Sequence, residues 1–160
     1  MMTFVDRPAS AAPDEGPLRI GFFSDVYAPQ VNGVAVSLAL LTRGLRAAGH
    51  SVTIFAPRFP GYADGESGVT RLPAVRALRL PAFFVALPGT PGVSLAVRRG
   101  HFDVFHTHTP LTLGLLAFLA AHLKRAPLIY TYHTAITDYA HYVPLIGRTR
   151  VARRGARHFS

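Results

Sequence analysis

The chain has 160 residues, 49% of them apolar and 16% charged, and its sixteen arginines and one lysine against eight acids give a formal net charge of +9. This length accommodates one domain with one core, and the mean hydropathy of +0.26 excludes a solvated, disordered chain. The absence of cysteine excludes disulfide scaffolds, iron–sulfur clusters and thiol catalysis. Residues 1–17 lack a secretory signal, and the longest apolar stretch, Leu111 to Ala121, is shorter than the roughly 20 residues that cross a bilayer, which predicts a cytoplasmic protein.

The first half of the chain predicts a strand, a helix and a second strand. Residues 1–17 are rich in proline, alanine and acids without periodicity, so we expect a disordered tail followed by one domain over 18–160. Residues 18–24 form an apolar run that predicts a buried strand. Apolar residues then recur at spacings of three and four from Val34 to Ala48, which predicts a helix capped by Gly49. Residues 51–56 predict the second strand.

The second half predicts further alternation of strands and helices. Prolines and glycines interrupt residues 58–91, where we expect only short extended segments at 69–72 and 76–80, followed by a short helix at 92–99. Strands are expected at 103–107 and 127–132. Between them, Thr109-Pro110 is expected to cap and begin a helix that is apolar nearly all round and therefore buried.

This alternation predicts an α/β fold with a Rossmann-like, doubly wound parallel sheet. In such sheets, ligands bind beyond the carboxyl ends of the strands. The loops that follow three predicted strands, residues 25–33, 106–110 and 133–142, are also where polar residues gather. We therefore expect the functional site in these three loops.

Asn32-Gly33 stands at the start of the first predicted helix. A glycine there would let backbone N–H groups approach an anion closely, and the helix dipole favours negative charge. The alternative is a turn glycine that is needed only for a positive φ. One glycine forms neither a dinucleotide-binding fingerprint nor a P-loop.

Histidines occupy the other two loops. His106 and His108 should share one face of a strand, as metal-ligand pairs do, but no zinc-hydrolase motif accompanies them, so we expect hydrogen-bonded histidines and no metal. His133 ends an apolar strand, where a neutral imidazole could hydrogen-bond a substrate hydroxyl or act as a base. The alternative for His133 is a residue that only caps the next turn.

The arginines predict attraction to a polyanion without identifying which one. No zinc finger, RNP motif or series of stacking aromatics favours nucleic acid. A basic face could instead lie on anionic lipid, and each run could also be only a solvated surface. The arginines considered for such a face are Arg71, Arg76, Arg79, Arg98, Arg99, Arg148, Arg150, Arg153, Arg154 and Arg157.

Three segments together resemble the N-terminal domain of family 4 retaining glycosyltransferases of the GT-B fold. They are RIGFFSDVYAPQVNGVAVSLALLTRGLRAAGHSVTIFAP, FDVFHTHTPLTLG and PLIYTYHTAITDYAHYV, and the likeness covers about residues 18–160. It is closest to members that glucosylate diacylglycerol or transfer mannose to lipid acceptors. The resemblance implies transfer of a hexose from a UDP- or GDP-sugar to an acceptor, with retention and without a cofactor.

The resemblance also implies residue roles. Asn32, Gly33, Val34 and Thr134 would contact the donor, with Gly33 against its diphosphate, and His133 would lie beside the donor sugar at the reaction centre. Acceptor contacts would come from Asp25, Tyr27, His108, Asp138 and Tyr139. The family's two donor-gripping glutamates have no counterpart, because the only glutamates are Glu15 and Glu66. We therefore expect the acceptor-side half of the enzyme, truncated before the donor-binding domain, lying peripherally on the cytoplasmic face of the membrane. The alternative is an inactive domain that binds anionic lipid or a partner through its arginines.

Overall fold

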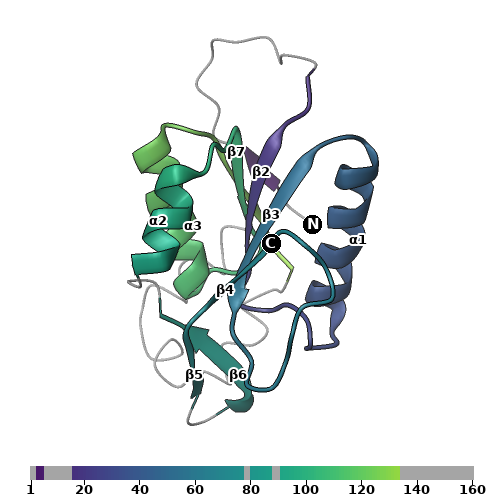
Figure 1. Ribbon diagram of the computed structural model, residues 1–160, viewed down its shortest axis with the longest axis vertical. Coiled ribbons are helices and arrows are strands. Elements are labelled where there is room, and N and C mark those ends of the chain that lie inside the picture. The colour runs from purple at the N-terminus through teal and green to yellow at the C-terminus, as the bar shows by residue number, and fades with distance from the viewer. Residues whose placement is uncertain (1–2, 6–15, 78–79, 88–90, 134–160) are drawn as a thin grey trace, which may run out of the picture.

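The computed structural model describes residues 3–5, 16–77, 80–87 and 91–133, which form a parallel sheet between two layers of helix (Figure 1). The strands of the main sheet are β1 (Thr3–Val5), β2 (Arg19–Phe23), β3 (Ser51–Pro57), β4 (Val69–Leu72), β7 (Val104–Thr107) and β8 (Leu128–Thr131). Their order across the sheet is β1-β8-β7-β2-β3-β4. The last five of these are parallel, which confirms the predicted Rossmann-like α/β fold.

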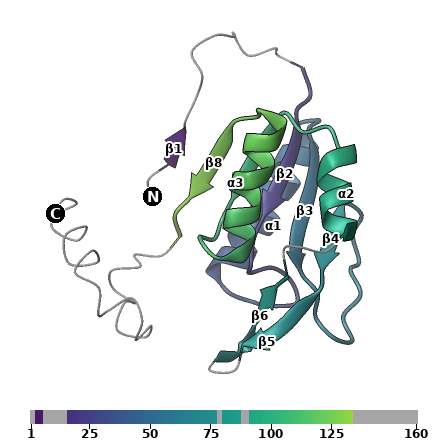
Figure 2. The same ribbon diagram turned by 90° about the vertical axis from the view of Figure 1, so that its left-hand side faces the viewer.

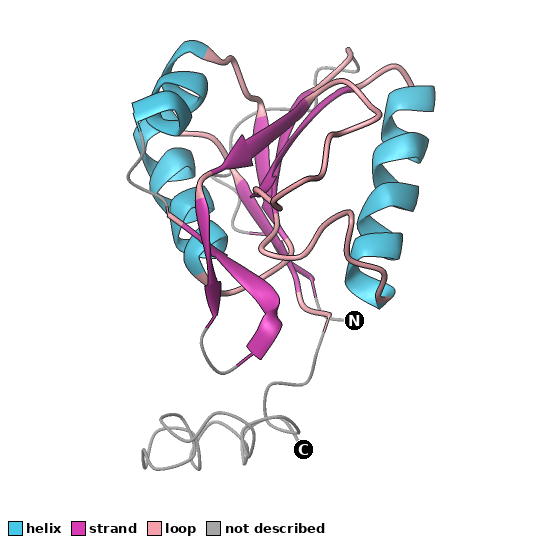
Figure 3. Ribbon diagram, turned by 60° about the horizontal axis from the view of Figure 1, so that its bottom comes forward, coloured by secondary structure: helices cyan, strands magenta, loops and turns pink. Residues whose placement is uncertain are grey.

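Helices cover both faces of the sheet. α1 (Gly33–Ala47) lies on one face, and α2 (Pro91–Arg99) and α3 (Thr112–Lys124) lie together on the other, as Figure 3 shows. The predicted cap of α1 is confirmed, because Gly49 has a φ of +89° and donates its N–H to the carbonyl of Arg46. Alternate residues of each strand enter two separate cores. Phe22 and Leu38 belong to the core under α1, and Phe23 and Phe55 belong to the core under α2 and α3.

The segment over residues 58–91 contains more regular secondary structure than its prolines predicted. β5 (Ala74–Ala77) and β6 (Leu80–Ala86) form an antiparallel hairpin that extends from the lower end of the main sheet in Figures 1 and 2. Ala86 is buried in the core under α2 and α3, so the hairpin is anchored to the domain. The β6 strand was not predicted, because Pro81 interrupts its pattern.

Three expectations require correction. Thr3–Val5 lie within the predicted disordered tail but form β1, which pairs antiparallel with β8 (Figure 2). The third helix begins at Thr112 with Leu111 at its N-cap, not at Thr109-Pro110, because the Thr109 hydroxyl instead bonds Asp25. The helix is also not buried all round. Four of its large apolar side chains, Leu115, Phe118, Leu119 and Leu123, are more than half exposed in the part of the chain described.

Candidate functional site

The sheet reverses its winding direction between β2 and β7. From β2 the chain winds outward through β3 and β4, and after the hairpin it returns to wind the other way through β7 and β8. Ligands of doubly wound folds bind at this switch point, beyond the carboxyl ends of the strands. Asp25 follows β2 there, His108 follows β7 and His133 follows β8. The structure thus brings together residues from all three predicted loops.

Asp25 joins the end of β2 to the start of α3. Its Oδ2 accepts a hydrogen bond from the Thr109 hydroxyl at 2.7 Å, and its Oδ1 accepts one from the Thr112 hydroxyl at 2.7 Å. The Leu113 N–H lies 3.3–3.4 Å from both oxygens, at a helix N-terminus that favours a negative charge. Asp25 is buried, so these internal partners occupy the side chain that we predicted to contact the acceptor.

The N-terminus of α1 opens beside the same site. The Asn32 side chain caps the helix by accepting the Ala35 N–H at 3.0 Å, and the first turn holds no acid. Gly33 is exposed, its φ is not positive, and a Cβ added to it would meet no atom within 4 Å. The alternative of a glycine required by the turn is therefore wrong, and the described domain itself gives no reason for glycine here.

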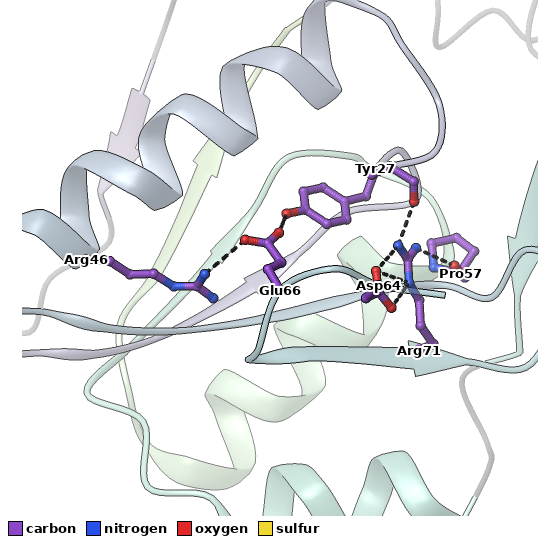
Figure 4. A network of polar contacts seen from close by, with 7 residues as sticks. Tyr27, Arg46, Pro57, Asp64, Glu66 and Arg71 are labelled. Carbon is purple, nitrogen blue, oxygen red and sulfur yellow. Dashed lines mark hydrogen bonds and ion pairs between the residues drawn. The ribbon is translucent and has the colours of Figure 1, made fainter. Parts of the chain in front are cut away.

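The loop between β2 and α1 is held from one side by Tyr27 (Figure 4). The Tyr27 hydroxyl donates to Glu66, and Arg46 of α1 approaches the other oxygen of Glu66 to 3.1 Å. Burial, together with the neighbouring carboxylate, raises the pKa of Tyr27 above its usual value, so the phenol stays protonated. Tyr27 was predicted to contact the acceptor, but it is buried and uses its hydroxyl internally.

Arg71 of β4 holds the same loop from the other side (Figure 4). Its Nη2 donates to the Ala28 carbonyl at 2.6 Å and its Nη1 donates to the Pro57 carbonyl at 2.8 Å. Its Nε and Nη2 pair with Asp64, and the guanidinium lies 5.5 Å from the centre of the Tyr27 ring. Arg71 was considered for a membrane-facing surface; instead, its side chain is only 10% exposed and fixes the loop that leads to α1.

Three histidines form a column at the ends of β7 and β8. His106 and His108 share a face of the strand, as predicted, with ring centroids 4.2 Å apart, and the His133 ring lies 5.2 Å from that of His108. Nε2 of His106 lies 2.7 Å from the Thr131 hydroxyl, and Nδ1 of His108 lies 2.9 Å from Nε2 of His133. Phe22 packs edge-on against the first two rings.

Burial keeps these imidazoles neutral. Burial, with a smaller contribution from neighbouring histidines, lowers the pKa of His106 to about 4 and that of His108 to about 2. Burial also lowers the pKa of His133, which is partly exposed. A neutral imidazole has one N–H and one bare nitrogen, so each ring can donate one hydrogen bond and accept one.

The remaining predicted residues fall into two groups. Val34 is half-buried in the first turn of α1, and His108, predicted to contact the acceptor, is buried against other side chains. Thr134, Asp138 and Tyr139 lie outside the described residues. Among the residues that are described, no three histidine or acidic side chains are grouped to hold a metal ion. Asp103, just before β7, pairs with Arg19 at 2.7 Å.

Sequence reasoning missed the residues that support the loop. Asp64 and Glu66 lie in a segment without periodicity, and their partners Arg46 and Arg71 are distant in sequence. One signal was available. The chain has only eight acidic residues against seventeen basic ones, so an acid within an otherwise weakly polar loop has a high chance of pairing with an arginine.

Several arginines do face solvent. Of those with a described side chain, Arg76, Arg98 and Arg99 are exposed, as are four that were not singled out, Arg19, Arg43, Arg58 and Arg125. Arg79 and the cluster from Arg148 to Arg157 lie outside the described residues. Over the described part of the chain, no helix combines the length and apolar character that a membrane span requires.

A family model and individual known proteins match the chain, and these matches agree on one family. The model of Glycosyltransferase Family 4 matches residues 31–160. The chain is 36% identical over 129 residues to an alpha-monoglucosyldiacylglycerol synthase of Streptococcus pneumoniae, covering 79% of this chain and 29% of the relative. It is 34% identical over 149 residues to the enzyme of the same name from Acholeplasma laidlawii, covering 88% of this chain and 35% of the relative.

A third relative carries a different name. The chain is 29% identical over 138 residues to a GDP-mannose-dependent alpha-mannosyltransferase of Corynebacterium glutamicum, covering 81% of this chain and 33% of the relative. The chain thus spans about a third of the length of the curated relatives it matches. The matched region includes α1 with Gly33, the histidine column and the loop after β8. The family match and the Rossmann-like sheet together show that this chain belongs to Glycosyltransferase Family 4.

Proposed function

We propose that the chain is the N-terminal, acceptor-side domain of a retaining glycosyltransferase that transfers a hexose from a UDP- or GDP-sugar to a membrane lipid. Two of the relatives are named as synthases of a glucosylated diacylglycerol, and a third is named as a GDP-mannose-dependent mannosyltransferase. These names support a nucleotide-sugar donor and favour a lipid acceptor over a free glycan. The donor-binding domain would be supplied by sequence that these 160 residues do not contain.

The observation that carries the proposal is the open N-terminus of α1 at the switch point. Gly33 is exposed and begins a 15-residue helix whose first turn holds no acid, and the described residues show no structural need for glycine there. Backbone N–H groups at such an end attract a phosphate, and a missing Cβ allows the closest approach. The diphosphate of a nucleotide sugar would bind there, with Asn32, Val34 and Thr134 beside it.

The chemistry follows from this placement. The bond from the anomeric carbon to the diphosphate oxygen breaks, a bond from that carbon to the acceptor oxygen forms, and the proton of the acceptor hydroxyl passes to the departing nucleoside diphosphate. His133 stands at the carboxyl end of β8, where its neutral ring would hydrogen-bond the donor sugar. Three of the residues expected near the acceptor are buried. Asp25, Tyr27 and His108 would therefore support the acceptor side of the site from below its surface. Asp138 and Tyr139 would contact it.

The membrane surface would hold the acceptor. The six exposed arginines named above other than Arg19, which is paired with Asp103, could attract anionic lipid on the cytoplasmic face, each contributing roughly 1 kcal/mol near the surface. We propose no resident cofactor, since the nucleotide sugar is itself the activated substrate.

The test uses a polypeptide in which this chain is followed by a donor-binding domain, for example that of the Acholeplasma laidlawii relative. It is incubated with UDP-glucose or GDP-mannose and with vesicles of diacylglycerol and anionic phospholipid. We expect a glycolipid with an α-linked hexose by mass spectrometry and NMR, and a loss of at least tenfold in kcat for the His133→Ala variant. Hydrolysis without transfer, or unchanged kcat for that variant, would contradict the proposal.

A second candidate, an inactive domain that attaches to anionic lipid, is favoured only by the exposed arginines. It predicts salt-sensitive sedimentation of the chain with anionic vesicles and no transfer in the hybrid protein. Replacing Arg98 and Arg99 together with glutamine should then abolish sedimentation. Such a result without any glycolipid would favour this candidate over the first.

A further inference from the structure

One member of the histidine column, His108, has a side chain whose only hydrogen-bonding partner among the described residues is another histidine. His108 is 3% exposed, and its ring is enclosed by those of Phe22, His106 and His133. Its Nδ1 lies 2.9 Å from Nε2 of His133, whereas its own Nε2 is buried without a partner among the described residues. The contact with His133 is therefore the one hydrogen bond of the His108 side chain over the described part of the chain, and its loss would leave a nitrogen of His133 without a partner.

One proton is shared across this contact. Both rings are neutral near pH 7, because burial lowers their pKa values. A neutral ring carries a single N–H, so the hydrogen bond is either Nδ1–H of His108 donating to His133 or Nε2–H of His133 donating to His108. Each alternative also fixes the protonation of Nδ1, the other ring nitrogen of His133. Nδ1 carries the proton in the first case and is bare in the second.

The unpartnered Nε2 of His108 decides between the two. If His133 donates, the N–H of His108 moves to Nε2, where it would be a buried donor without an acceptor. If His108 donates, its Nε2 is a bare nitrogen, which is a buried acceptor without a donor. Orphaned buried N–H groups are the rarer of the two in folded proteins. The geometry therefore favours donation from Nδ1 of His108 to Nε2 of His133.

We propose that His108 is a positioning residue that holds His133 in the tautomer with its proton on Nδ1. In this tautomer Nε2 of His133 is occupied, and the remaining nitrogen can donate a hydrogen bond but cannot remove a proton. Resting on the proposed function, this makes His133 a donor to an oxygen of the nucleotide sugar and not a general base.

The tautomer can be measured directly on the full 160-residue chain. We would label the histidines with 15N and record two-bond proton–nitrogen correlations near pH 7.5. The His133→Gln variant assigns the His133 signals by their loss. For His133 we expect a protonated Nδ1 and a bare Nε2, and for His108 the same pattern. A protonated Nε2 on His133, or rapid averaging of both forms, would overturn the proposal.

Two variants separate positioning from packing. In His108→Asn the side-chain amide nitrogen falls close to the site of Nδ1 and can still donate, so His133 should keep its tautomer. In His108→Leu no donor remains, and His133 should revert to the Nε2-protonated form that free imidazole side chains favour. Because the wild-type spectrum alone decides the tautomer, the proposal stays testable even if the leucine variant does not fold.

Activity measurements then distinguish a failure of this positioning role from a failure of the proposed function. In the hybrid enzyme we expect His108→Asn to retain kcat within about threefold and His108→Leu to lower it at least tenfold with a similar KM for the lipid. The expected tautomer with full activity of His133→Ala would leave the positioning intact but contradict the role of His133. Loss of activity in His133→Ala with the opposite tautomer would contradict the positioning alone.

Discussion

Arg71 reaches from β4 to the carbonyl oxygen of Ala28, 2.6 Å away, and so ties the loop between β2 and α1 to the far edge of the parallel sheet. The same guanidinium pairs with Asp64 and is almost fully enclosed. The position of α1, and with it that of Gly33, thus depends on an ion pair formed by residues that contact neither predicted substrate.

Replacing Arg71 with methionine should destabilise the domain markedly. The variant keeps most of the apolar stem but leaves the Asp64 carboxylate and two carbonyl groups without their donor, which typically costs about 3 kcal/mol for an enclosed pair. Urea denaturation followed by circular dichroism measures the loss. The matched control is Arg58→Met at an exposed position, where we expect less than about 0.5 kcal/mol. Equal losses in both variants would show that Arg71 does not fix the loop.

Gly33→Ala should separate folding from donor binding. The new methyl group meets no atom within 4 Å, so the stability of the domain should be unchanged or slightly higher. In the hybrid enzyme, calorimetric titration with UDP or GDP should show an affinity at least tenfold lower, because the methyl group intrudes where the diphosphate approaches the helix. Gly44→Ala is the control, since this mid-helix glycine also has open space and should gain about 0.5–1 kcal/mol without affecting nucleotide affinity. An unchanged nucleotide affinity in Gly33→Ala would show that the diphosphate does not bind at this helix end.

The histidine column should make the domain less stable in mild acid. Unfolded histidines titrate near pH 6.5, whereas those of the folded protein have pKa values of about 4 for His106 and about 2 for His108. Between these limits the unfolded chain binds protons that the folded chain does not, so stability falls as pH decreases from 6.5 towards 4. The slope of the unfolding free energy against pH should correspond to about two protons.

His108→Asn provides the control for this slope, which should fall to about one proton. Arg19 holds the pKa of Asp103 at about 2, so the loss of that ion pair would appear only at a lower pH than the histidine effect. A stability that does not change between pH 6.5 and 4.5 would contradict the burial of both histidines.

Asp25→Asn should weaken the junction between β2 and α3. The amide keeps one acceptor oxygen but turns an NH₂ group towards a threonine hydroxyl, and it removes the charge from the helix N-terminus. We expect a loss of about 1–3 kcal/mol, measured by urea denaturation. Asp103→Asn, which breaks the exposed pair with Arg19, should cost less than about 1 kcal/mol. If the two variants behaved alike, the Asp25 network would contribute no more than a surface ion pair.

Transfer should not require a divalent cation. Among the described residues no three histidine or acidic side chains are grouped to hold one, and Nε2 of His106 and Nδ1 of His108 are engaged with Thr131 and His133. After dialysis of the hybrid enzyme against EDTA, we expect the rate of glycolipid formation to be unchanged. A rate that collapses and returns on addition of magnesium or manganese would show that a metal assists the departing diphosphate.

The fold could be predicted largely from local patterns, because apolar runs and the spacing of α1 report directly on burial. The start of α3 could not. Thr109-Pro110 has the sequence of a helix start, but the hydroxyl of Thr109 bonds Asp25, 84 residues earlier, and the helix begins two residues later than predicted. The face shared by His106 and His108 followed from strand geometry, whereas the contact between His108 and His133 depends on how β7 and β8 pair. The loop supports at Glu66 and Arg71 depend on similarly distant contacts, which a single sequence does not reveal.

Two opposing effects act on the self-association of the 160 residues as a free polypeptide: the exposed apolar face of α3 and the net charge. Leu115, Phe118, Leu119 and Leu123 offer apolar area to any neighbouring molecule, and because each is a little more than half exposed, burying the rest would gain roughly 1–2 kcal/mol per side chain. The net charge of +9 keeps such molecules apart. Since salt at 0.15 M confines that repulsion to about 8 Å, dilute buffer would preserve the dispersed chain and concentrated salt would bring its helices together.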